Sequence, residues 1–288
     1  MTLLFMMPNY HAATEVWMRR MLESLEEKIS GLVVKDSTGE STWRGIFPVF
    51  SVNPPRHEVR FLSSLLKKFG LIVYKQSKSP EETVLKTIES ISPTKILCHY
   101  GTFASSFTKV WNKVDIPLYI HFHGYDATFD LRKEANPDNR VHPDDYMKTL
   151  LGLQERALFL ANSNFTKALL VDGGISADRV KVKYYGIPVP EKSKVHSTNK
   201  QIMILHLGRL IDFKSPDRTI KAFEIAKSRG LDGTLLIAGD GNLRNYCELL
   251  RLRSPYKNSI HLLGSVSRES AQELFFTADI YTQHNILG

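Results

Sequence analysis

The chain has 288 residues, 42% of them hydrophobic and 24% charged, which is the balance of a soluble globular protein. No apolar run reaches the roughly 18 to 20 residues that a membrane-spanning helix needs, and residues 1–10 lack the basic leader and cleavage site of a signal peptide. The net charge of +8 favours anionic partners.

Short apolar runs alternate with amphipathic stretches through the first 188 residues. We expect strands at 3–7, 45–50, 71–74, 95–99, 118–122, 158–162 and 180–184, and helices at 16–29, 81–90 and 165–170. Strand–helix alternation with buried strands predicts a parallel, doubly wound sheet.

Much of the excess of positive over negative charge lies in one stretch, residues 56–78, which holds six cations and one acidic residue, Glu58. Apolar residues recur there at helical spacing, at Val59, Leu62, Leu66 and Phe69. Two interpretations stay open: an ordinary surface helix, or a basic helix in peripheral contact with an anionic membrane.

The alternation breaks at Ile187-Pro188-Val189-Pro190, and the polar residues that follow suit a linker at 189–200. It then restarts with strands at 202–207, 234–238, 260–263 and 279–282 and helices at 216–229, 243–253 and 268–277. The fold class that we predict is α/β, with two Rossmann-like doubly wound parallel-sheet domains at 1–188 and 201–288. The second has about four strands where a full domain commonly has five or six, so we expect it to be incomplete.

A cationic loop follows the first strand of the second half. Gly208 would let a phosphate approach the backbone, Arg209 could bind it with two prongs, and Lys214 would add a point charge. The helix from Pro216 would direct free N–H groups at the same place. One strand later comes a glycine loop, Gly239-Asp240-Gly241, which we expect to open onto the same crevice.

The segment His121-Phe122-His123-Gly124-Tyr125-Asp126 follows a strand in the first half. Strand alternation turns His121 and His123 to one face, and a sharp turn at Gly124 would let His123 and Asp126 point into a cleft. No third or fourth ligand has metal-site spacing, so we predict no metal. The two cysteines, Cys98 and Cys247, are far apart, which favours core thiols and a reducing cytoplasm.

Several segments together resemble the retaining family 4, or group 1, glycosyltransferases of GT-B architecture. They are HFHGYD at 121–126, NSNFTKALL at 162–170, YYGIPV at 184–189 and HLGRLIDFKSPDRTIKAFEIA at 206–226. The later IAGDGNLR, HLLGSV and ADIYTQH segments follow in the order of that family, so the resemblance covers nearly the whole chain.

The resemblance implies a role for each part. Arg209 and Lys214 would neutralise the diphosphate of a UDP- or GDP-linked sugar and stabilise the leaving group without a metal. His123 would contact the donor sugar, and Gly239 and Gly241 would shape the nucleotide pocket. The first domain would take a saccharide or lipid-linked acceptor, and closure about the linker would bring the substrates together. The family is typical of surface polysaccharide assembly, at the inner face of the membrane.

The sequence departs from the family in two places. Ser215 stands where the family has glycine, and the family's paired glutamates would follow Tyr281–His284, after the chain has ended. A truncated, non-catalytic fragment or binding subunit therefore stays open as an alternative. An epimerase or phosphorylase of the same architecture and a nucleic-acid binder are weaker alternatives, because the phosphorylase lysine and any nucleic-acid module are lacking.

Overall fold

A computed structural model describes residues 2–9, 16–36, 39–53, 79–128, 142–143, 145–187, 189 and 201–285. Its contacts divide the chain into unit 1, Met1–Pro188, and unit 2, Val189–Gly288. The predicted strand 71–74, the basic stretch 56–78 and all of the linker except Val189 lie outside the described residues.

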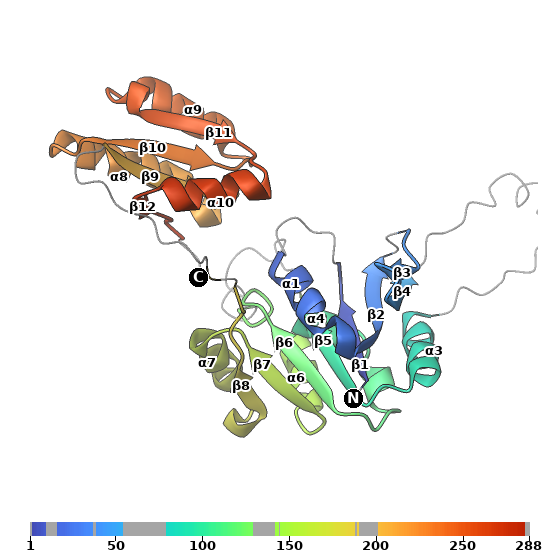
Figure 1. Cartoon of the computed structure of the whole chain (residues 1–288). Helices are drawn as coiled ribbons and strands as arrows, with labels where there is room; N and C mark the ends of the chain where they lie inside the picture. Colours follow the sequence, from blue (N-terminus) through green and yellow to red (C-terminus); the bar gives the residue numbers. More distant parts are fainter. Residues whose placement is uncertain are drawn as a thin grey trace, which may run out of the picture. The chain divides into compact units, whose positions relative to one another are not determined.

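Unit 1 is built on one sheet in the order β3-β4-β2-β1-β5-β6-β7-β8 (Figure 1). Every neighbouring pair is parallel except β3 and β4. The chain starts at β1, builds outward through β2 and β4, and then returns to β5 on the other side of β1, as in a Rossmann sheet. The strands are β1 Leu3–Met7, β2 Ile29–Asp36, β3 Thr42–Trp43, β4 Phe47–Asn53, β5 Lys95–His99, β6 Leu118–Phe122, β7 Ala157–Ala161 and β8 Val180–Val182.

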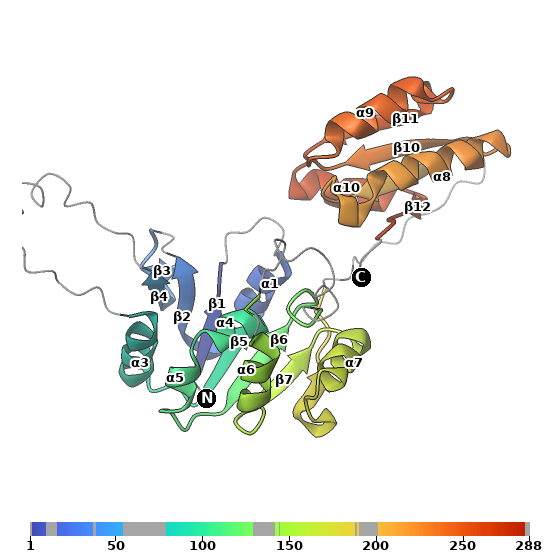
Figure 2. The ribbon, with the colours of Figure 1, turned by 180° about the vertical axis from the view of Figure 1, so that it is seen from behind.

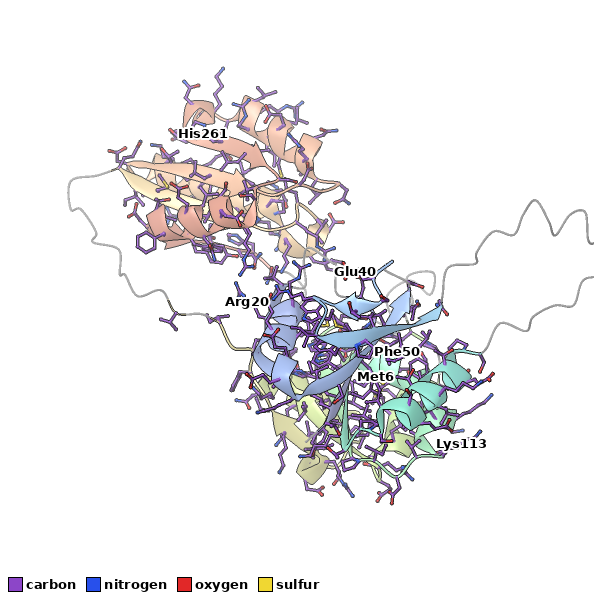
Figure 3. The ribbon with its side chains drawn as sticks, turned by 45° about the vertical axis from the view of Figure 1, so that its right-hand side comes forward. Met6, Arg20, Glu40, Phe50, Lys113 and His261 are labelled. Carbon is purple, nitrogen blue, oxygen red and sulfur yellow. The ribbon has the colours of Figure 1, made fainter. Side chains whose placement is uncertain are left out.

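Helices cover both faces of this sheet: α1 lies on the face seen in Figure 1, and α6 lies on the face seen in Figure 2. Every residue of β1 is buried, and Met6 lies in this packed interior while Lys113 projects from the surface (Figure 3). The helices are α1 Val16–Leu25, α3 Pro80–Ile91, α4 Gly101–Ser105, α5 Thr108–Trp111, α6 Tyr146–Leu153 and α7 Asn164–Asp172, with 3-10 turns at Glu26–Lys28 and Ala177–Arg179.

Unit 2 has a sheet of four parallel strands in the order β11-β10-β9-β12. As in unit 1, the first strand lies inside the sheet, with later strands on both sides. Helices α8 and α9 contact each other, and α10 lies on the opposite face of the sheet from α8 (Figures 1 and 2). The elements are β9 Ile202–Leu207, α8 Pro216–Ser228, β10 Gly233–Ala238, α9 Arg244–Arg253, β11 Ile260–Gly264, α10 Arg268–Thr277 and β12 Ile280–Tyr281, with 3-10 turns at Asp212–Lys214 and Lys257–Ser259.

The predicted fold class, α/β with two parallel-sheet domains, is confirmed. The predicted helix at 16–29 is too long, because α1 ends at Leu25 and the missed strand β2 begins at Ile29. Three helices, α4, α5 and α6, were also missed; each has eight residues or fewer, too short for a clear helical period. Within the described ranges, no helix is both long and apolar enough to cross a membrane.

Candidate functional site

Polar loops gather at the carboxyl ends of the strands in each unit. In unit 2 the order of the strands reverses between β9 and β12, and in unit 1 it reverses between β1 and β5. Loops diverge on either side of such a reversal and leave a crevice, which is where open α/β sheets bind ligands.

The glycine loops of unit 2 touch backbone to backbone. A Cβ at Gly239 would lie 1.9 Å from the carbonyl oxygen of Gly208, and one at Gly241 would lie 2.4 Å from that of Leu210. The Leu210 N–H donates to the Asp240 carbonyl at 2.9 Å. Side chains are thus excluded at both glycines, and the loop after β9 is fixed against the loop after β10.

Two cations extend from the fixed loop after β9. Arg209 is exposed and Lys214 is half-buried. Neither forms an ion pair with any residue that the structure describes. Lys214 ends the 3-10 turn directly before α8, whose N-cap is Ser215 and whose first residue is Pro216. The structure therefore brings the predicted phosphate-binding residues to one edge of unit 2.

The Asp240 carboxylate is already engaged within its own loop. Its Oδ1 accepts the Gly241 N–H and its Oδ2 pairs with Arg244 Nη1, both at 2.7 Å. The Gly241 hydrogen bond and Arg244 lower the pKa of Asp240. Asp240 thus fixes the glycine turn, and its negative charge would repel a phosphate.

A second polar network of unit 2 includes residues of β9 and α8 and was not predicted from the sequence. Thr219 Oγ1 of α8 lies 3.1 Å from His206 Nδ1 and 3.1 Å from His284 Nδ1. Burial chiefly, with help from His284 and Lys214, lowers the pKa of His206 to about 4. This network ties β9 and α8 to the segment after β12.

In unit 1, three histidines from neighbouring strands form one cluster. His99 ends β5, His121 lies in β6 and His123 follows β6. The ring centroids of His121 and His123 are 4.5 Å apart, and His99 Nδ1 lies 3.1 Å from His123 Nε2. The sequence reasoning found His121 and His123 but missed His99, because only the pairing of β5 with β6 brings it there.

Asp126 is fully buried, so it does not point into a cleft as the sequence predicts. Its carboxylate accepts the N–H groups of His123 at 2.8 Å and Gly101 at 2.9 Å. Burial raises the pKa of Asp126 to about 6, and these hydrogen bonds offset part of that rise. Asp126 joins the turn after β6 to the start of α4.

The backbone between His99 and Gly101 is strained. Tyr100 has a φ of 69°, which is rare for a residue with a side chain. Its ring meets that of His123 edge-on at 4.5 Å. A Cβ at Gly101 would lie 2.3 Å from Tyr146 Oη. Strain of this kind collects at functional sites, which supports this end of the sheet as one.

The histidine cluster has the composition of a zinc site, since one ring nitrogen from each histidine lies within 4.8 Å of the others. Burial lowers the pKa of His121 to about 4, so its ring is neutral near pH 7. However, His99 Nδ1 and His123 Nε2 hydrogen-bond each other. A metal bound at those two atoms would have to break that bond first.

Among the described residues of unit 1, two hollows lie near strand ends or the histidine cluster. One, of about 440 Å³, is lined by Lys35, Asn53, Thr102, Tyr125 and His142 among others. The second, of about 710 Å³, lies beside the histidine cluster and is lined by Trp17, Leu97, His121, Leu160 and Tyr185 among others. The first combines polar groups with aromatic rings, and the second is mostly apolar.

Comparison with known proteins gives a family match in unit 2. Residues 189–286 match the family described as glycosyl transferases group 1, which is about a third of the chain. No curated protein matches the chain.

Solved structures resemble both units. The lipopolysaccharide outer core galactosyltransferase WaaB has 13% identity and a TM-score of 0.70, over 99% of this chain and 74% of that one. Anabaena HepE in complex with UDP has 15% identity and a TM-score of 0.70 with the same coverage. Sucrose-phosphate synthase from Thermosynechococcus elongatus has 13% identity and a TM-score of 0.66, over 97% of this chain and 74% of that one. The chain therefore has the GT-B fold, and its unit 2 matches the glycosyl transferases group 1 domain.

Proposed function

We propose that this protein is a retaining glycosyltransferase that moves a sugar from a nucleotide-diphosphate sugar to a saccharide or lipid-linked saccharide, in surface polysaccharide assembly. The observation that carries the proposal is the edge of unit 2, where two cations without ion-pair partners among the described residues stand beside glycine loops that exclude side chains. The group 1 match covers this same unit.

The donor would bind through its diphosphate. Arg209 can bind two phosphate oxygens with its planar guanidinium, and Lys214 adds a second positive charge on the other side of the loop. The N-terminus of α8 supplies a partial positive charge at the same edge. These fixed charges would stabilise the leaving nucleotide as the sugar departs, and we propose that no metal or other cofactor is needed. Solved structures of HepE hold UDP and UDP-glucose, which supports a nucleotide-sugar donor.

The acceptor would bind to unit 1. The hollow of about 440 Å³ lies at the carboxyl ends of β1, β2 and β4, where Lys35, Asn53 and Thr102 offer hydrogen bonds to hydroxyl groups. His123, at the carboxyl end of β6, would contact the donor sugar. We propose that the reaction takes place in the cytoplasm. Peripheral membrane contact stays a prediction for residues 56–78, outside the described part of the chain.

The test is calorimetric titration of the full chain with UDP and with GDP, in the presence of a chelator. We expect one nucleotide to bind, and we expect Arg209→Ala and Lys214→Ala each to weaken binding about tenfold to a hundredfold, because each removes charge-assisted hydrogen bonds worth about 1.5 to 3 kcal/mol.

Lys257→Ala is the matched control, since it removes the same charge from the turn before β11. That turn lies at the amino ends of the strands, whereas the cationic loop lies at their carboxyl ends. It should bind the nucleotide as the unmodified chain does. Equal affinity in all four proteins, or no binding by a folded chain, would contradict a donor site at the cationic loop.

A further inference from the structure

A chain of hydrogen bonds runs from the start of α7 to His99. Thr166 Oγ1 donates to Asn162 Oδ1 at 2.6 Å, and Asn162 Nδ2 donates to Tyr185 Oη at 3.3 Å. Tyr185 Oη lies 2.6 Å from His123 Nδ1, and His123 Nε2 lies 3.1 Å from His99 Nδ1. Four separate segments of unit 1 are thus linked by hydrogen bonds that pass through His123.

The helix cap fixes the direction of this chain at its start. Ser163 Oγ accepts the Thr166 N–H at 3.1 Å and donates to Thr166 Oγ1 at 3.0 Å. Because the Thr166 hydroxyl accepts that proton, its own proton is directed to Asn162 Oδ1. The Asn162 amide is therefore oriented with its NH₂ group towards Tyr185, as a donor.

The orientation of the Asn162 amide determines which atoms donate and which accept in the next hydrogen bonds, those of Tyr185 and the imidazole rings. The Tyr185 oxygen accepts from Asn162 and carries a single proton, which we assign to the short bond with His123 Nδ1. Burial lowers the pKa of both His123 and His99 well below the ordinary value, so each ring is neutral and has one N–H and one bare nitrogen. With Nδ1 accepting, the proton of His123 lies on Nε2 and points to His99.

We propose that Asn162 and Tyr185 are positioning residues that hold His123 in its Nε2–H tautomer, with Nδ1 as a hydrogen-bond acceptor. Packing supports the same arrangement. The Trp17 ring stacks on Tyr185 with centroids 4.5 Å apart and lies 4.2 Å from the centroid of His123. The rings of Tyr185 and His123, which share the hydrogen bond, therefore both pack against the Trp17 ring.

The tautomer has a chemical consequence, which rests on the proposed function. A ligand group that displaced Tyr185 from His123 Nδ1 would have to donate a proton to it. A sugar hydroxyl can do so, whereas an ionised phosphate oxygen cannot. A neutral histidine with a bare Nδ1 therefore suits a sugar, and the phosphate-binding charges lie in the other unit.

The test is nitrogen NMR of the full chain with labelled histidine, in which the ring nitrogens report the tautomer directly. Loss of one signal set in His123→Gln assigns the residue. We expect the Nε2–H form in the unmodified chain. This readout needs no nucleotide, so failure of the tautomer assignment and failure of the proposed function are distinguishable.

Asn162→Asp is the decisive variant. A carboxylate at 162 accepts from both Thr166 and Tyr185, so the Tyr185 proton turns away from His123 and His123 should switch to the Nδ1–H form. Asn164→Asp adds the same charge at an exposed position two residues away and should leave the tautomer unchanged.

Tyr185→Phe removes the donor but keeps the ring that stacks on Trp17, and it should mix the two tautomers. Tyr184→Phe, at an exposed neighbour, is its control and should have no effect. An Nδ1–H tautomer in the unmodified chain would overturn the proposal. So would an unchanged tautomer in a folded Asn162→Asp protein.

Discussion

At the scale of single residues, Gly239 should be the position least tolerant of a side chain. Gly239 and Gly230 both have positive φ, 133° and 95°, but a Cβ at Gly239 would collide with the Gly208 carbonyl while one at Gly230 meets nothing within 4 Å. We expect Gly230→Ala to lower the free energy of unfolding by about 1 kcal/mol, from backbone strain alone. Gly239→Ala should lower it by about 3 kcal/mol or more, because overpacking is added to that strain.

Urea unfolding of the two variants measures this difference. Gly230→Ala should keep nucleotide binding, because the residue lies in the turn after α8, away from the loops after β9 and β10. Similar losses of stability in both variants would mean that the loops of unit 2 are farther apart than the structure places them.

At the residue level, the sequence predicts which residues lie close together when they share one short segment. Gly208, Arg209 and Lys214 lie on one short loop, so their proximity could be predicted from the strand before them. His99 and Tyr185 could not be found in this way, because they reach His123 from 24 and 62 residues away. Their contacts depend on the order of the strands in the sheet, which periodicity does not give.

At the scale of the element, the start of α8 is strained at Ser215. This residue has a φ of 41° and a ψ of 57°, the left-handed region that favours glycine. Its side chain compensates in part, since Oγ donates to the Asp212 carbonyl at 2.7 Å. We expect Ser215→Ala to lose about 1 kcal/mol of stability, because it removes the hydrogen bond and keeps the strain.

Ser215→Gly removes both the hydrogen bond and the strain. Left-handed backbone costs other residues about 1 to 2 kcal/mol, so the glycine variant should be more stable than the alanine variant by about 1 kcal/mol. Thermal unfolding of the two proteins side by side gives the order. An alanine variant as stable as the glycine variant would show that Ser215 is not strained.

The elements themselves could be predicted where an apolar run was bounded by clear turns, as at β1, β5, β6 and β9. Strand β2 was missed because only the turn Glu26–Lys28 separates it from α1. In addition, Gly31 interrupts the apolar run by which the strand would be recognised. That glycine packs against Ile91, and a Cβ there would lie 2.2 Å from its side chain. The contact comes from α3, far along the chain, so no local pattern indicates it.

At the scale of the whole molecule, the buried histidines should make unit 1 more sensitive to acid than unit 2. Burial lowers the pKa of His99, His121 and His123 in unit 1 and of His206 in unit 2. A group whose pKa is lower in the folded state contributes stability that is complete above the pKa of the unfolded state, which is 6.5 for histidine. That stability is lost as the pH falls towards the pKa of the folded state, which is about 4 for His121. Asp126 acts in the opposite sense, because its pKa is raised to about 6, but it is one group against three.

The positions of the tryptophans allow this to be measured in the intact chain. All three, Trp17, Trp43 and Trp111, lie in unit 1, so their fluorescence reports unit 1 alone, whereas far-ultraviolet circular dichroism reports both units. Unfolding in urea would be followed by both signals as the pH is lowered from 6.5 to 4. The urea midpoint seen by fluorescence, which reports unit 1, should fall further than the midpoint of the dichroism change that fluorescence does not share, which reports unit 2. In His121→Asn that fall should be smaller, since one buried imidazole no longer resists protonation, while replacing the exposed His261 should change nothing. If both transitions moved together in every variant, the acid sensitivity would belong to the molecule as a whole and not to the histidine cluster.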